Sequence, residues 1–159
     1  MKPLLAPRLT RQGLAAYAPG QRPAGKTLGL CNGAFDLLHV GHVRYLQDAA
    51  SRCDILVVAV NSDASVRGLK GPTRPVIPQD DRAELVAAIS GVDVVHIFPE
   101  STVEPVLRLL RPDFHFKGTD YTPQSVPEAE LVASLGGQVV IVGDPKDHST
   151  TQLVGKLGR

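Results

Sequence analysis

The sequence predicts an α/β protein: a doubly wound sheet of five parallel strands covered by helices on both faces, in three α/β/α layers. Short apolar runs alternate along the chain with amphipathic segments of helical period. The apolar runs lack the polar alternation of a strand that faces water on one side. Strands of this kind, each followed by a helix, are typical of a parallel sheet with a Rossmann-like arrangement.

The expected elements follow one another from residue 26 to residue 157. Strands are expected at KTLGLC (26–31), ILVVAVNSD (55–63), DVVHIF (93–98), DFHFKG (113–118) and QVVIVG (138–143). Helices are expected at GHVRYLQDAA (41–50), QDDRAELVAAIS (79–90), STVEPVLRLL (101–110), SVPEAELVASLGG (125–137) and STTQLVGKL (149–157). RGLKGPTRPVIP (67–78) is expected to be a loop. Residues 1–25 are interpreted as an N-terminal extension with room for one short helix, and residues 26–159 as a single domain.

Particular residues justify several helix boundaries. Pro78 can open the helix that follows it, because a missing N–H costs little at a helix start. Ser101 or Thr102 is the expected cap of the third helix, with Pro105 still in its first turn. Gly136 is expected just past the end of the fourth helix.

Composition excludes several classes of function. The chain has 159 residues and a net charge of +1, from 17 basic and 16 acidic residues. This balance gives no general attraction to nucleic acid or to an anionic membrane, so any anion site must be local. Cys31 and Cys53 lie beside apolar runs and are interpreted as buried small side chains. The chain shows no signal peptide and no run of about 20 apolar residues, so we expect a reduced, cytoplasmic protein.

Polar clusters follow four of the five predicted strands. NGAFD (32–36), NSD (61–63), KGTDY (117–121) and DHSTT (147–151) come after the first, second, fourth and fifth strands, while the strand interiors are almost entirely apolar. Ligands of open parallel sheets bind at the carboxyl ends of the strands. The distribution therefore predicts one site at that edge.

The segment GAFDLLHVGH (33–42) holds two histidines at the predicted start of a helix. Alone, such a pair is more often a matter of packing. After a strand, however, Gly41 permits close approach of a phosphate, and the helix N-terminus favours an anion. His39 and His42 can then contact oxygens of one phosphate and stabilise the charge that develops in phosphoryl chemistry.

This segment resembles the HxGH signature of the nucleotidylyltransferase superfamily of cytidylyl- and adenylyltransferases. NGAFDLLHVGHVRYLQDA, VVAVNSDASVRGLKGPTRPVIPQDDRAELVAA, KGTDYTPQSVPEAELV and the STT near the C-terminus together resemble its heptose 1-phosphate adenylyltransferases, over roughly residues 26–157. The resemblance implies transfer of AMP from ATP to a sugar 1-phosphate, D-glycero-β-D-manno-heptose 1-phosphate above all, giving ADP-heptose and pyrophosphate. It also implies Mg²⁺, held largely by phosphate oxygens and water, a homodimer, and a separate sugar kinase upstream.

Two rival functions stay open at this point. One is a cytidylyltransferase acting on glycerol 3-phosphate or a related alcohol phosphate, since those enzymes share the HxGH and STT motifs. The other is a nucleotide-binding regulatory module without catalysis. A protein-interaction scaffold is a more distant possibility, which would require a large exposed apolar patch.

The resemblance also implies roles for individual residues. The catalytic residues would be His39, His42, Lys70 and Lys117. No residue is expected to bind a metal directly. The nucleotide-binding residues would be Asn32, Gly33, Ala34, Phe35, Asp36, Gly41, His42, Asn61, Asp63, Arg82, Gly118, Asp120, Ser149, Thr150 and Thr151.

Four of these assignments have an alternative. Asp36 could orient the signature turn or reach metal-bound phosphates. Lys70 could meet phosphate charge or be a solvated loop lysine. Arg82 could reach a substrate or belong to a charged surface face. The hydroxyls of residues 149–151 could bind a nucleotide phosphate or simply cap the last helix.

The remaining polar residues are assigned less specific roles. His96 is interpreted as a core histidine, and packing is also the favoured interpretation of His115, although it shares a strand face with Lys117. Position 34 is Ala where the family often has Cys or Thr. Asp147 and His148 precede STT where the family usually has a Gly, which leaves the choice between ATP and CTP open; the role of His148 is also open.

Overall fold

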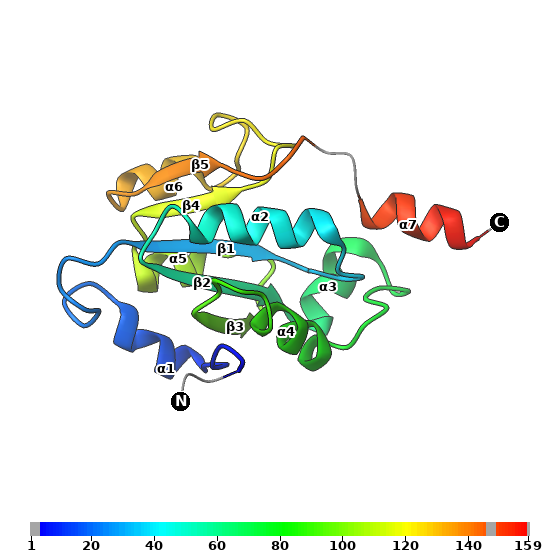
Figure 1. Ribbon diagram of the computed structural model, residues 1–159, viewed down its shortest axis with the longest axis horizontal. Coiled ribbons are helices and arrows are strands. Elements are labelled where there is room, and N and C mark those ends of the chain that lie inside the picture. Colours follow the sequence, from blue (N-terminus) through cyan, green and yellow to red (C-terminus); the bar gives the residue numbers. More distant parts are fainter. Residues whose placement is uncertain (1–3, 146–148, 159) are drawn as a thin grey trace.

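A computed structural model describes residues 4–145 and 149–158. Its centre is a five-stranded sheet in the order β3-β2-β1-β4-β5, and every neighbouring pair is parallel (Figure 1). The strands are β1 (Leu28–Gly33), β2 (Ile55–Asn61), β3 (Val94–Phe98), β4 (Phe114–Lys117) and β5 (Gln138–Ile141). The predicted five-stranded parallel fold is therefore confirmed.

Helices cover both faces of the sheet. The full set is α1 (Arg11–Leu14), the 3-10 helix η1 (Ala15–Tyr17), α2 (Val40–Ala50), α3 (Asp63–Lys70), α4 (Gln79–Ala87), α5 (Glu104–Leu110), α6 (Ala129–Ser134) and α7 (Thr150–Leu157). On one face, Leu46 of α2 and Val86 of α4 pack with Val58 of β2. On the other, Leu107 of α5 packs with Leu30 and Val57. The two cores are the physical basis of the doubly wound, three-layer arrangement.

Several helix predictions differ from the structure. Helix α4 ends at Ala87 and not at Ser90. Helix α3 occupies part of the segment expected as strand and loop, because the Ser62 hydroxyl accepts the Ser65 N–H and caps a helix whose Val66 is buried. Helix α5 begins at Glu104, after Val103 and not after a serine or threonine cap; Val103 is buried, and Pro105 lies in the first turn as expected. Helix α6 is shorter at both ends than predicted.

Other boundaries agree with the sequence. Pro78 stands at the N-cap of α4. Gly136 follows α6 with a φ of 86°, a left-handed conformation that favours glycine. His96 is buried in β3, where its Nδ1 lies 2.9 Å from the carbonyl of Leu9, so its interpretation as a core histidine is confirmed.

The N-terminal segment packs along the edge of the sheet. The Leu9 N–H donates to the Val95 carbonyl at 2.9 Å, and the Val95 N–H donates to the Pro7 carbonyl at 3.0 Å. Leu14 is completely buried in the same core as α5. These contacts cover the exposed backbone of the edge strand β3. Among the described residues, no helix is long and apolar enough to cross a membrane.

Candidate functional site

A cleft of about 460 Å³ opens at the carboxyl ends of β1 and β4. The turn after β1, the start of α2, the segment after β4, the segment after β5 and the start of α7 all contribute to its wall. The cleft brings together most of the predicted site residues: Asn32, Gly33, Ala34, Phe35, Asp36, His39, Gly41, His42, Lys70, Lys117, Gly118, Asp120, Ser149 and Thr151. The expected single site at this edge of the sheet is thus present as a cavity.

Two histidines cap the helix that faces the cleft. His39 is the N-cap of α2, and its Nδ1 accepts the Gly41 N–H at 3.1 Å. In return, the His39 N–H donates to Nδ1 of His42 at 3.2 Å. A backbone amide can only donate, so each Nδ1 must be the unprotonated nitrogen of its ring. The neutral rings therefore carry their proton on Nε2.

The electrostatic surroundings keep His42 neutral. Burial, with smaller contributions from the neighbouring His39 and Lys70, lowers the pKa of His42 to about 4. The two imidazole rings lie with their centroids 4.0 Å apart, and the Phe35 ring meets His42 edge-on at 5.5 Å. At neutral pH the helix start thus offers neutral Nε2–H donors beside its own N-terminal dipole.

The turn between β1 and α2 is strained. Phe35 and Leu37 have φ values of 50° and 51°, in the left-handed region that non-glycine residues rarely adopt. Such conformations cost on the order of 1–3 kcal/mol each and persist only when the surroundings impose them. Asp36, between the two, supplies the contacts that hold this turn.

The Asp36 carboxylate fixes the turn to a second loop. It is buried and accepts the amides of Val76 and Ile77 and the guanidinium of Arg74, whose Nε lies 2.9 Å from Oδ2. Burial raises the pKa of Asp36, but the hydrogen bonds from Val76, Ile77 and Arg74 outweigh it and hold the pKa below its ordinary value. This geometry corresponds to the turn-orienting alternative for Asp36.

Lys70 ends helix α3 at the rim of the cleft. Desolvation by neighbouring groups lowers the pKa of Lys70, although the residue is exposed, and the Arg74 guanidinium acts in the same direction. Its effect on the pKa of His42 indicates that the ammonium lies near the start of α2. A lysine that already shares positive surroundings is disposed to bind an anion.

A second cationic group lies at the end of β4. Lys117 is buried, and its Nζ lies 3.3 Å from Oδ1 of Asn32, 3.9 Å from a carboxylate oxygen of Glu128 and 5.1 Å from the centre of the Tyr121 ring. Nε2 of His115 lies 3.0 Å from the same Asn32 oxygen. Burial, with a smaller contribution from Lys117, lowers the pKa of His115 to about 3, so this ring is neutral as well.

The sequence model of the cytidylyltransferase-like family matches residues 30–154. The chain belongs to this family. It is 50% identical over 149 residues to the bifunctional protein HldE of Mesorhizobium japonicum, covering 94% of this chain and 30% of that protein. It is 46% identical over 147 residues to HldE of Syntrophotalea carbinolica, covering 92% of this chain and 30% of that protein. The chain thus spans less than a third of these relatives.

Two solved structures are similar in fold. A lipopolysaccharide core biosynthesis protein of Thermoplasma volcanium matches 77% of this chain and 100% of its own, at 28% identity and a TM-score of 0.65. Pantoate-beta-alanine ligase of Francisella tularensis has a TM-score of 0.63 over 94% of this chain and 76% of its own. At 11% identity, the second structure shares the fold alone.

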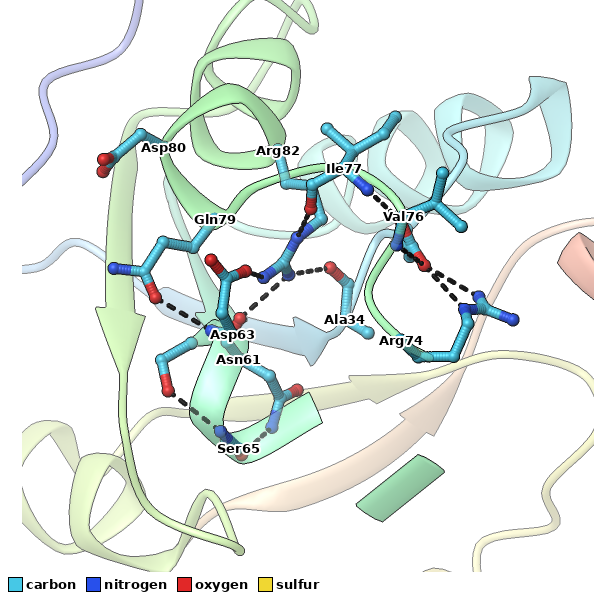
Figure 2. A network of polar contacts seen from close by, with 12 residues as sticks. Ala34, Asn61, Asp63, Ser65, Arg74, Val76, Ile77, Gln79, Asp80 and Arg82 are labelled. Carbon is cyan, nitrogen blue, oxygen red and sulfur yellow. Dashed lines mark hydrogen bonds and ion pairs between the residues drawn. The ribbon is translucent and has the colours of Figure 1, made fainter. Parts of the chain in front are cut away.

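Among the residues predicted for the site of this cytidylyltransferase-like domain, Asn61, Asp63 and Arg82 are absent from the cleft lining. Arg82 is completely buried, so its interpretation as part of a charged surface face is wrong. Its guanidinium donates to the carbonyls of Ala34, Asn61 and Ile77 and pairs with Asp63 at 2.9 Å (Figure 2). These contacts satisfy carbonyls at the ends of β1 and β2, and they tie Arg82 into the layer behind the cleft wall.

Asn61 and Asp63 belong to the same layer. The Asn61 side-chain amide donates to the Ser65 hydroxyl at 2.9 Å, and the Asp63 N–H donates to the Gln79 side chain at 2.8 Å (Figure 2). The Asn61 side chain thus joins β2 to α3, and Asp63 joins α3 to α4 through its backbone N–H and through its carboxylate, which pairs with Arg82. Proximity to a strand end was not enough to bring them into the cleft.

The start of α7 contributes to the wall of the cleft. The Ser149 hydroxyl accepts the Gln152 N–H at 3.1 Å, which makes it an N-cap, and Ser149 and Thr151 also line the cleft. Thr150 begins the helix. Asp147 and His148, which bear on the choice of base, lie outside the described residues.

Sequence reasoning missed several residues of the cleft. Arg44 and Tyr45 contribute from α2, and Arg44 pairs with Asp144 at 2.9 Å across the cleft edge. Tyr45 is three residues from His42 and so shares its helix face, a signal that was available in the sequence. Thr119 and the segment 142–145 also line the cleft. They are far apart in the sequence and are joined by a hydrogen bond from the Thr119 hydroxyl to the Asp144 carbonyl, at 2.8 Å.

Proposed function

We propose that this domain transfers AMP from ATP to a sugar 1-phosphate, D-glycero-β-D-manno-heptose 1-phosphate, releasing pyrophosphate. The observation that carries the proposal is the reciprocal capping of His39 and His42 at a helix start that faces the cleft. Oriented, neutral donors at a helix N-terminus are suited to the phosphates of a nucleotide. The sequence resemblance supplies the identity of the sugar.

In the proposed reaction, a phosphate oxygen of the acceptor attacks the α-phosphorus of ATP in line. The new P–O bond forms as the bond to the β-phosphate bridging oxygen breaks, and its electron pair leaves with pyrophosphate. Nε2–H groups of His39 and His42 donate to the oxygens on which negative charge increases. No enzyme nucleophile takes part: burial raises the pKa of the Cys31 thiol to about 12 and that of Cys53 to about 11.

The two lysines would serve different anions. Lys70 influences the pKa of His42 and so belongs with the proposed nucleotide phosphates. Lys117 influences the pKa of His115 at the β4 end. In-line transfer places the acceptor and the leaving group on opposite sides of the α-phosphorus, so we assign Lys117 to the acceptor phosphate and Lys70 to the triphosphate.

Mg²⁺ would accompany ATP and neutralise its triphosphate. Within residues 4–145 and 149–158, no three His, Cys, Asp or Glu side chains cluster as a metal site. The residues present are compatible with a Mg²⁺ ion that phosphate oxygens and water largely coordinate.

The relatives support the same proposal. The chain resembles bifunctional HldE proteins and a lipopolysaccharide core biosynthesis protein, and a sugar 1-phosphate must itself come from a phosphorylation step. We therefore also propose a sugar kinase upstream, cytoplasmic action on ATP and a homodimer as the family-level assembly.

A matrix of nucleotides and acceptors tests the function. Purified protein with Mg²⁺ is incubated with ATP or CTP and with heptose 1-phosphate or glycerol 3-phosphate, and pyrophosphate release is measured. ATP with heptose 1-phosphate is expected to give the highest kcat/KM. Turnover with CTP and glycerol 3-phosphate alone would favour the cytidylyltransferase rival, and nucleotide binding without any turnover would favour the regulatory module.

A further inference from the structure

Three side chains meet at one oxygen atom on the floor of the cleft. Oδ1 of Asn32, at the end of β1, lies 3.0 Å from Nε2 of His115 and 3.3 Å from Nζ of Lys117, both on the neighbouring strand β4. Asn32 lines the cleft, whereas His115 is completely buried behind it. The contact thus connects a residue of the cleft wall to a residue that no substrate can reach.

The chemistry of the three groups fixes their orientation. A lysine ammonium can only donate a hydrogen bond, so the Asn32 atom that faces Lys117 must be the oxygen. The imidazole nitrogen that faces the same oxygen must then carry the proton. His115 is therefore the Nε2–H tautomer, and the Asn32 amide nitrogen points away from both β4 side chains.

The Asn32 amide nitrogen is available to a ligand. Among residues 4–145 and 149–158 it has no hydrogen-bond partner, and it is not buried. Asn32 and Lys117 both line the cleft, so a ligand there can contact the amide nitrogen and the ammonium from different sides. A carboxamide beside an ammonium forms a donor pair that suits a phosphate oxygen.

Burial of His115 agrees with the predicted packing role, and the buried ring makes a polar contact in addition. Nδ1 of His115 is buried and has no hydrogen-bond partner among the described residues, so the ring leaves one polar atom unsatisfied. Burying an unsatisfied polar atom has a cost, which the Nε2–H contact to Asn32 offsets.

We propose that His115 is a positioning residue, which orients the Asn32 carboxamide so that its amide nitrogen donates to the phosphate of the acceptor beside Lys117. The inference rests on the proposed nucleotidyl transfer and adds a determinant of acceptor binding to it. His115 itself touches no substrate. Without its contact, the Asn32 side chain keeps only the bond to Lys117 and can rotate away from the productive orientation.

Steady-state kinetics with separate variation of the two substrates test the proposal. His115→Leu is expected to raise the KM for the sugar phosphate about tenfold, the effect of one lost hydrogen bond. The KM for ATP is expected to stay within about twofold, because the donors near His42 are unchanged. His115→Gln carries an amide N–H within similar reach and is expected to restore most of the acceptor affinity, whereas the shorter His115→Asn is not.

A matched control and a double-mutant cycle separate positioning from stability. His96→Leu removes another buried strand histidine that does not line the cleft, so it is expected to lower the unfolding temperature without changing the acceptor KM. Asn32→Ala alone is expected to raise the acceptor KM, and adding His115→Leu to it is expected to have no further effect.

Several results would overturn the inference. An unchanged acceptor KM in folded His115→Leu would do so, as would additive effects in the cycle. Should His115→Leu fail to fold, equal acceptor KM values for His115→Gln and His115→Asn would count against it too. An inactive wild-type protein would instead refute the proposed function, so the two failures are distinguishable.

Discussion

His39 and His42 cap the same helix through each other: the His39 amide donates to Nδ1 of His42 at 3.2 Å, and Nδ1 of His39 accepts the Gly41 amide at 3.1 Å. The backbone therefore selects the tautomer of both rings before any substrate binds. An arrangement of this kind needs no proton transfer to become ready for catalysis. It leads to predictions about protonation and about substitution.

The first prediction concerns the protonation state of His42. Its pKa, about 4, means that the ring stays neutral from pH 8 down to about pH 5. Nitrogen-15 NMR of histidine-labelled protein is expected to show Nε2 protonated and Nδ1 unprotonated throughout that range. A His42 signal that titrates near pH 6.5 would contradict the neutral-donor account.

The second prediction concerns the donor at Nε2. His42→Ala is expected to lower kcat by about 10²- to 10³-fold, the usual loss when one oriented donor to a transition state is removed. His42→Gln keeps an N–H at a similar reach and is expected to lose only about tenfold. Circular dichroism melts of both variants serve as the control for folding, and equal kcat values for the two would argue against a donor role.

The third prediction concerns the buried guanidinium behind the cleft. Arg82→Ala leaves Asp63 and three carbonyls without their donor, so we expect a loss of about 3 kcal/mol or more in the free energy of unfolding. Arg8→Ala breaks an exposed ion pair with Asp80 and is expected to cost less than about 1 kcal/mol. Urea unfolding of the two variants makes the comparison, and similar losses would contradict the structural role of Arg82.

Features of the fold that depend on local sequence patterns could be predicted from the sequence, whereas features that depend on contacts between distant segments could not. The alternation of apolar and amphipathic segments predicted the five strands, because the period of a segment reports which faces are buried. Helix α3 was missed because DASVRGLK includes a glycine and only Val66 of its apolar residues is buried. Its cap, Ser62, was present in the sequence but lay within a segment that looked like the end of a strand.

The site shows the same division. Residues adjacent to the first strand end, such as His39 and Asn32, lie in the cleft as expected. Arg82 stands near the acidic residues Asp81 and Glu84 in the sequence, and only the meeting of β1, β2 and α4 creates the set of carbonyls that buries it. Likewise, the alignment of His115 with Asn32 depends on strand order, which the residues of either strand do not reveal.

The fourth prediction concerns Asp36 and pH. Asp36→Asn removes a carboxylate that accepts two amides and a guanidinium, so we expect a loss of about 1–3 kcal/mol in unfolding free energy at pH 7. The pKa of folded Asp36 lies below that of the unfolded chain. The stabilisation is therefore fully present above about pH 4, the ordinary carboxyl range, and is lost as the pH falls through the folded value.

Denaturant unfolding of wild type and Asp36→Asn between pH 7 and pH 3 measures this difference. The difference in unfolding free energy between wild type and Asp36→Asn is expected to decrease only at the lowest pH values. Asp81→Asn, on the exposed side of α4, is the control and is expected to change stability by less than about 0.5 kcal/mol at every pH. A difference in unfolding free energy that increased toward low pH would contradict the lowered pKa of folded Asp36.

The central claim is direct transfer of AMP to an acceptor phosphate in the cleft between His42 and Lys117. It is tested most directly with heptose 1-phosphate that carries oxygen-18 in its terminal phosphate oxygens, incubated with ATP and Mg²⁺. Mass spectrometry and phosphorus NMR of the products are expected to place the label in the sugar nucleotide, including the oxygen that bridges its two phosphorus atoms, and none in pyrophosphate. Unlabelled sugar nucleotide, labelled pyrophosphate, or no sugar nucleotide at all would contradict the account.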